Sequence, residues 1–104
     1  MISQIKPSFT KNNTLKISIS SDILNNKYKV CFSLVYSIKE IEGAVIINQI
    51  GRYYELEVLN ESILIKLQTP KTGTYNLSCG PEGLFLINKE NKLVECSIEN
   101  LKFE

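Results

Sequence analysis

The chain has 104 residues and a mass of 11.8 kDa, enough polymer for one domain with its own hydrophobic core. Its content of 43% hydrophobic and 22% charged residues is typical of soluble globular domains and excludes a disordered tail, a collagen-like repeat and a membrane protein. The net charge of +1 provides no strong field for nucleic acid or a membrane surface, and the lack of histidine excludes His-based catalysis and His-ligated metal sites.

The residue counts favour strands over helices. Ile, Val, Thr, Tyr and Phe total 33 residues, whereas Ala, the best helix former, occurs once. Apolar and polar residues alternate with period two in short segments that turn residues separate. Strands are therefore expected at residues 15–20, 28–37, 44–50, 53–58, 63–68, 75–79, 84–87 and 94–99.

Three of these segments carry further expectations. Residues 28–37 form the longest alternating run and are expected to make one strand. The nearly continuous apolar run 44–50 predicts a strand that is covered on both faces or lies near the centre of a sheet. Only residues 20–27 and 37–42 have room for a single helical turn, and a change of parity predicts a bulge or bend near Asn100.

Short strands at a spacing of about 8–12 residues predict an all-β fold, either an antiparallel β-sandwich or a barrel. We expect an immunoglobulin-like sandwich of about seven to eight strands. We expect one domain over residues 1–104, with a fragment of a longer chain as the alternative. Around Tyr75 the sequence resembles the tyrosine corner of immunoglobulin-like sandwiches, because a turn with Gly73 precedes the tyrosine. Gly80 and Pro81 open a tight turn, since no phosphate-loop Lys follows them and a strand comes next.

The three cysteines, Cys31, Cys79 and Cys96, lack the Cys-x-x-Cys spacing of zinc ribbons and thioredoxin-like motifs. Free thiols in a reducing compartment are expected, with a Cys79–Cys96 disulfide as the alternative. The N-terminus has no basic region followed by an apolar run, so a cytoplasmic location is expected. The sequence predicts no metal site and no cofactor.

Two pairs of carboxylates, Glu40 with Glu42 and Glu55 with Glu57, occur at i and i+2. On a strand these side chains share one face, about 6.5–7 Å apart, a separation that two-carboxylate glycoside hydrolysis uses. Alternating glutamates are also typical of the solvent face of a sheet, where exposed carboxylates gain no raised pKa. We interpret both pairs as solvent-facing residues.

Candidate ligand or interface residues are Arg52, which is the sole arginine, together with Tyr53 and Tyr36. An exposed Tyr53 could stack on a sugar ring or anchor a protein interface. The alternative is a tyrosine that only caps the edge of the sheet. The basic cluster at residues 27–29 is too small for a nucleic-acid surface, so no nucleic-acid partner is expected.

Three stretches together resemble a known family: FSL at 32–34, NQIGRYYEL at 48–56 and GPEGLFLI at 80–87, followed by a final β run. Their order is similar to the small β-sandwich domain that precedes the catalytic barrel in some bacterial β-N-acetylhexosaminidases of glycoside hydrolase family 20. The similarity spans residues 30–98 or so. The family's catalytic Asp-Glu pair has no counterpart here, since the only Asp is Asp22.

The resemblance therefore implies a non-catalytic accessory domain that packs against or orients a catalytic domain, with a weak sugar contact through Tyr53. The alternative function is a stand-alone module that binds another protein through a sheet edge or an exposed apolar patch. Neither function makes this domain an enzyme, and neither requires a membrane or nucleic acid.

Overall fold

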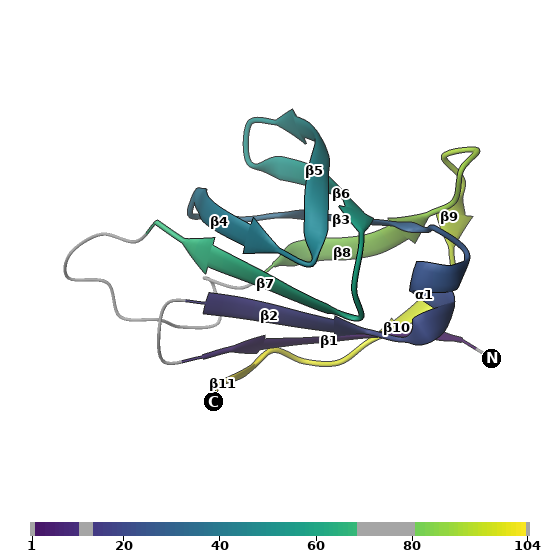
Figure 1. The fold of residues 1–104 in the computed structure, drawn as a ribbon, viewed down its shortest axis with the longest axis horizontal. Helices are drawn as coiled ribbons and strands as arrows, with labels where there is room; N and C mark the ends of the chain where they lie inside the picture. Colours follow the sequence, from purple (N-terminus) through teal and green to yellow (C-terminus); the bar gives the residue numbers. More distant parts are fainter. Residues whose placement is uncertain (1, 11–13, 69–80, 104) are drawn as a thin grey trace.

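A computed structural model describes residues 2–10, 14–68 and 81–103 of the chain. Within this part the chain forms eleven strands and one short helix, so the predicted all-β fold is confirmed (Figure 1). The elements are β1 (Ser3–Phe9), β2 (Thr14–Ile19), α1 (Ser21–Asn25), β3 (Lys29–Ser33), β4 (Ile38–Glu42), β5 (Ala44–Ile50), β6 (Tyr53–Val58), β7 (Ser62–Leu67), β8 (Glu82–Ile87), β9 (Leu93–Val94), β10 (Cys96–Ile98) and β11 (Lys102–Phe103).

The strands form two sheets, which pack as a sandwich. The first sheet has the order β10-β1-β2-β7-β4, with β11 also paired to β1, and the second has the order β5-β6-β3-β8-β9. Pairing is antiparallel except where β10 and β11 run parallel to β1. Both chain termini therefore lie on the first sheet (Figure 1).

The core lies between the sheets and is made by the alternate residues that the period-two pattern predicts. On β2, Leu15 and Ile17 are fully buried, while on the facing sheet Val30 and Phe32 of β3 and Leu56 of β6 are fully buried. Burying one such side chain stabilises the fold by about 1.5–3 kcal/mol. The intervening residues of these strands face outward, which leaves the outer sheet faces for polar groups.

Strand β1 was not predicted, because Pro7 interrupts an otherwise alternating pattern and proline normally marks an edge or a non-strand. The pairing of β1 shows why proline is tolerated here. On one side β10 pairs with β1 only over Ser3 to Ile5, and β11 pairs with it only at Ser8 and Phe9. Pro7 therefore lies in the gap between β10 and β11, where no described strand is present to accept a hydrogen bond from a backbone N–H. Proline, which lacks this N–H, costs the sheet no hydrogen bond at this position.

The expected single strand over 28–37 is wrong, because β3 ends at Ser33 and the chain crosses to the other sheet. The segment 37–42, one of the two with room for a helical turn, instead forms β4 against β7. Its apolar residues Ile38 and Ile41 are three apart, as in a helix, and both pack on the core. A register shift between Ile38 and Glu40 inserts an extra residue, so the two isoleucines reach the same face of a strand.

The prediction that the strand at 44–50 is covered on both faces is wrong. Strand β5 is the edge of its sheet, with β6 as its one neighbour in the described ladder, and most of its residues are exposed. The chain reaches it from β4 through Gly43, whose φ of +84° lies in the left-handed region. A Cβ at Gly43 would lie 2.2 Å from the carbonyl oxygen of Ser62, so only glycine fits this crossing.

The remaining expectations concern the short helix and the C-terminal third of the chain. Helix α1 lies inside segment 20–27, which has room for one helical turn, and an interruption falls near Asn100, between β10 and β11. The expected strand 94–99 is split, since β9 belongs to the second sheet and β10 to the first. The expected strand 75–79 and the structural residues Gly73, Tyr75 and Gly80 lie outside the described residues, whereas Pro81 directly precedes β8.

Candidate functional site

The β5–β6 hairpin carries a group of exposed apolar side chains, which we call the hairpin patch: Val45, Ile47 and Ile50. Their exposed fractions are 46%, 43% and 67%. No charged residue occurs from Gly43 to Gly51, so water meets an uncharged edge along the whole of β5. The sequence pattern missed this patch because a continuous apolar run does not distinguish a central strand from an exposed one.

Two other described sheet edges are protected in ways that β5 is not. Strand β4 carries Lys39, Glu40 and Glu42, and β9 is only two residues long. Charge and short length are the means by which proteins prevent unwanted pairing at a sheet edge. Strand β5 has seven residues and retains one protective feature, a bulge between Ile46 and Asn48. The bulge interrupts the backbone edge but leaves the apolar side chains accessible.

The hairpin turns at Gly51 and Arg52 and projects from the body of the sandwich (Figure 1). Gly51 has a φ of +59°, a conformation that glycine adopts without steric cost. The carbonyl of Arg52 accepts a hydrogen bond of 3.0 Å from the N–H of Leu34, which is itself buried. This bond ties the turn to the segment that leaves β3, so the hairpin is anchored at its tip as well as its base.

On the outer face of the hairpin, Tyr53 forms a small polar network. Its hydroxyl donates to Oε2 of Glu55 at 2.8 Å, and Nδ2 of Asn48 donates to Oε1 of the same carboxylate at 3.1 Å. The hydrogen bond from Tyr53, followed by that from Asn48, lowers the pKa of Glu55 below its ordinary value. Glu55 is therefore held as a carboxylate and does not act as a general acid at neutral pH.

The ring of Tyr53 lies beside that of Phe85 on β8, with centroids 6.3 Å apart and planes 12° from parallel. Between them on β3 is Cys31, whose cross-strand partners are Glu55 and Phe85. Cys31 is out of phase with the core, as its position in the sequence predicts, yet it is fully buried. Burial raises the pKa of its thiol, so Cys31 stays neutral and is not an activated nucleophile.

Cys96 is also a free thiol, half-buried beside the core, and burial raises its pKa as well. The alternative of a Cys79–Cys96 disulfide involves Cys79, which lies outside the described residues.

A depression of about 350 Å³ adjoins the hairpin turn and brings together two of the three candidate residues, Arg52 and Tyr53. Glu82 at the start of β8 contributes a carboxylate to the same depression, and Ser33 a hydroxyl. The third candidate, Tyr36, packs against the hydrophobic core and does not line this depression. The remaining lining residues are Leu34, Val35 and Ile50.

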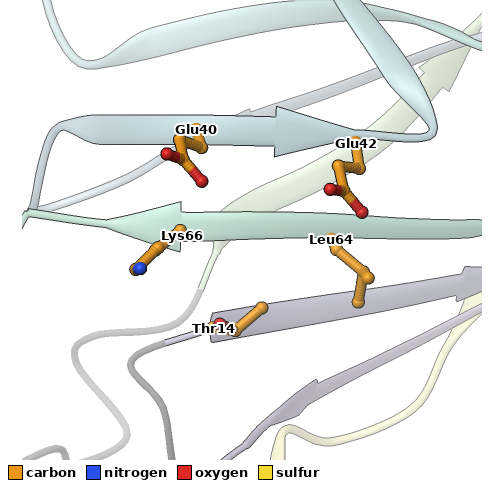
Figure 2. Close-up of a pocket in the computed structure, with 5 residues that line it drawn as sticks. All are labelled: Thr14, Glu40, Glu42, Leu64 and Lys66. Carbon is orange, nitrogen blue, oxygen red and sulfur yellow. The ribbon is translucent and has the colours of Figure 1, made fainter.

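The carboxylate pair Glu40 and Glu42 lies on the opposite sheet. Figure 2 shows both side chains pointing from β4 toward β7, above Lys66 and Leu64. The cavity they line with Thr14 measures about 130 Å³, and both glutamates are exposed. Lys66 is the cross-strand partner of Glu40. This arrangement fits the interpretation of the pair as solvent-facing residues of an outer sheet surface.

Comparison with protein-family models, curated proteins and solved structures gives no match to this chain. The resemblance to the hexosaminidase accessory domain therefore stays a prediction. Across residues 2–10, 14–68 and 81–103, no group of three or more Cys, Asp and Glu side chains is placed to hold a metal ion. No helix in that same part of the chain has the length and apolar character that crossing a bilayer requires.

Proposed function

We propose that this chain is a non-catalytic β-sandwich module that binds another protein through the hairpin patch. The observation that carries the proposal is the exposure of Val45, Ile47 and Ile50 on an uncharged edge strand. Exposed apolar side chains gathered on one sheet edge are a feature of protein interaction sites. The bulge in β5 favours docking of side chains over addition of a long continuous strand.

The chemistry around the hairpin supports a binding role over a catalytic one. Glu55 is a hydrogen-bonded carboxylate, and Cys31 is a buried neutral thiol. Glu55 is therefore not poised as a general acid at neutral pH, and Cys31 is not an activated thiolate. Arg52 and Tyr53, both residue types enriched at the centres of interfaces, line one depression with Ile50 of the hairpin patch.

The partner in this proposal is a catalytic domain of the β-N-acetylhexosaminidase type, which the sequence resemblance implies. An immunoglobulin-like arrangement of the sandwich belongs to the same proposal, supported by the tyrosine-corner pattern around Tyr75. The partner's identity is tested by examining the gene that encodes these 104 residues, together with the genes beside it. A hexosaminidase barrel in the same chain or an adjacent gene is the expected result, and a gene and neighbourhood without a hydrolase contradicts it.

A weak sugar contact is a second candidate function, favoured by the depression that Arg52, Tyr53 and Glu82 line. It combines an aromatic ring with donors and acceptors of both charges, which is the chemistry that recognises a pyranose. A glycan-array screen tests this contact. Binding that Tyr53→Ala abolishes supports it, whereas an array without signal removes Tyr53 from the set of ligand-binding residues.

Selection of peptides from a random library on the immobilised chain tests the protein-binding proposal, whichever protein is the partner. We expect selected peptides to protect the amides of residues 44–50 from hydrogen exchange. Ile50→Lys places a charge in the hairpin patch and should weaken binding at least about tenfold, because burial of an Ile contributes about 1.5–3 kcal/mol.

Leu93→Lys is the matched control, because Leu93 is 77% exposed on β9, away from the hairpin. It should leave peptide binding unchanged. Peptides that protect other strands, or that bind the Ile50→Lys variant as tightly as the wild type, refute the proposal.

A further inference from the structure

The outer face of the first sheet carries a second polar feature, formed where β1 and β2 pair. In the antiparallel register Lys6 lies opposite Ser18 and Ser8 lies opposite Lys16. On the other side of β1, Lys102 of β11 is the parallel partner of Ser8. Directly opposed residues have Cβ atoms about 4.5–5.5 Å apart, so three lysines and two serines share one small area of this face.

These residues line a depression of about 200 Å³, to which Pro7 and Glu99 also contribute. Glu99 is the one acidic group in it, and it forms an ion pair of 3.7 Å with Lys102. Three lysines and one glutamate give the depression a local charge of +2, although the whole chain carries only +1. The depression is therefore more positive than the molecule as a whole.

Apart from Lys102, the side-chain donors in this depression are not used by the fold. Among the described residues, the ammonium groups of Lys6 and Lys16 and the hydroxyls of Ser8 and Ser18 have no hydrogen-bond or ion-pair partner. Lys66, on the same sheet face, lies outside this depression and is the register partner of the acidic residue Glu40. Neighbouring ammonium groups repel one another, and an anion between them removes that repulsion while accepting several hydrogen bonds.

We propose that this depression, defined by Lys6, Ser8, Lys16, Ser18 and Lys102, binds a tetrahedral oxyanion carried by a ligand as a sulfate or phosphate ester. The volume exceeds that of the anion alone and leaves space for part of the group that bears it. Exposed ion pairs are individually weak, so a single anion binds with a Kd of about 1 mM or weaker. The site lies on the first sheet and the hairpin patch on the second, so both can be occupied together.

The test is a titration of the full chain with sodium sulfate, followed by amide chemical shifts in nuclear magnetic resonance spectra. Sodium chloride holds the ionic strength constant, because general screening would otherwise imitate binding. We expect saturable shifts confined to amides of β1, β2 and β11. Glucose 6-sulfate and glucose 6-phosphate in separate titrations distinguish the two esters, and the tighter one identifies the natural class.

The double variant Lys6→Gln with Lys16→Gln should weaken sulfate binding at least about fivefold. Lys66→Gln is the matched control and should bind sulfate as the wild type does, since it removes the same charge from the same face outside the depression. Shifts that do not saturate, that sodium chloride reproduces, or that Lys66→Gln reduces as much as the double variant refute the site. All three chains are first compared by circular dichroism, so that a folding defect is not read as lost binding.

Discussion

Replacement of Gly43 by alanine should destabilise the fold far more than an ordinary surface substitution. Two penalties add: a φ of +84° costs a residue with a Cβ about 1–2 kcal/mol, and the new Cβ lies 2.2 Å from the Ser62 carbonyl oxygen. That oxygen belongs to the backbone at the start of β7, so relief requires a shift of the strand, an overpacking that typically costs about 1–3 kcal/mol. We expect a loss of about 2–5 kcal/mol in the free energy of unfolding, measured by urea denaturation.

Gly51→Ala is the control for this prediction, because Gly51 also has a positive φ of +59° but no heavy atom lies within 4 Å of its added Cβ. It should lose only the conformational part, about 1–2 kcal/mol. For a domain of this size each kcal/mol lowers Tm by about 4–8 °C, so the two variants are readily distinguished. A Gly43→Ala chain as stable as Gly51→Ala would refute the argument that contact with Ser62 determines the crossing into β5.

Tyr53→Phe removes a donor to Glu55 and should raise the pKa of that carboxyl, as a carbon-13 NMR titration would detect. Because the folded pKa of Glu55 lies below its ordinary value of 4.5, the carboxylate stabilises the fold above that pH, and this effect is lost as pH falls through the lowered pKa. The free energy of unfolding of the variant should be about 0.5–1 kcal/mol lower at pH 7, and should change less on acidification. An acid dependence of stability equal to that of the wild type would contradict this. Phe32→Ala should cost about 3–5 kcal/mol in urea denaturation, because Phe32 is fully buried in the core; a loss below about 1 kcal/mol would mean that the core lies elsewhere. In a variant with the other two cysteines changed to serine, Cys31 should react with a thiol reagent only at the rate of unfolding, and rapid reaction of the folded chain would contradict its burial.

Where burial follows a simple alternation, the sequence was sufficient to predict local structure. Leu15 and Ile17 on β2 and Val30 and Phe32 on β3 occupy the predicted inward positions, because the side-chain period of a strand is two. The same period placed Cys31 outside the core, on the face that it shares with Glu55. Its complete burial was not predictable, since it depends on aromatic rings from two other strands.

Irregularities in the strands misled the pattern in a consistent way. Ile38 and Ile41 have helical spacing only because a bulge separates them in β4. The sequence pattern does not predict β1, because a proline such as Pro7 is normally unfavourable within a strand. Proline fits here only because of where β10 ends and β11 begins, almost a full chain length away. Of the candidate ligand residues, Arg52 and Tyr53 meet at one depression because they are adjacent in a turn, whereas Tyr36 turns toward the core.

By itself, the order of apolar and polar residues determined that this protein is made of short strands and which side chains of β2 and β3 face inward. The tertiary structure alone decided that the apolar strand β5 lies at an edge, and that Lys6, Lys16 and Lys102 surround one depression. The physical reason is that the two-residue period of a strand is a local property of its backbone. Whether that strand is buried or exposed depends instead on which distant segments of the chain pair with it or pack on it. The exposed hairpin patch and the basic depression are both consequences of that pairing.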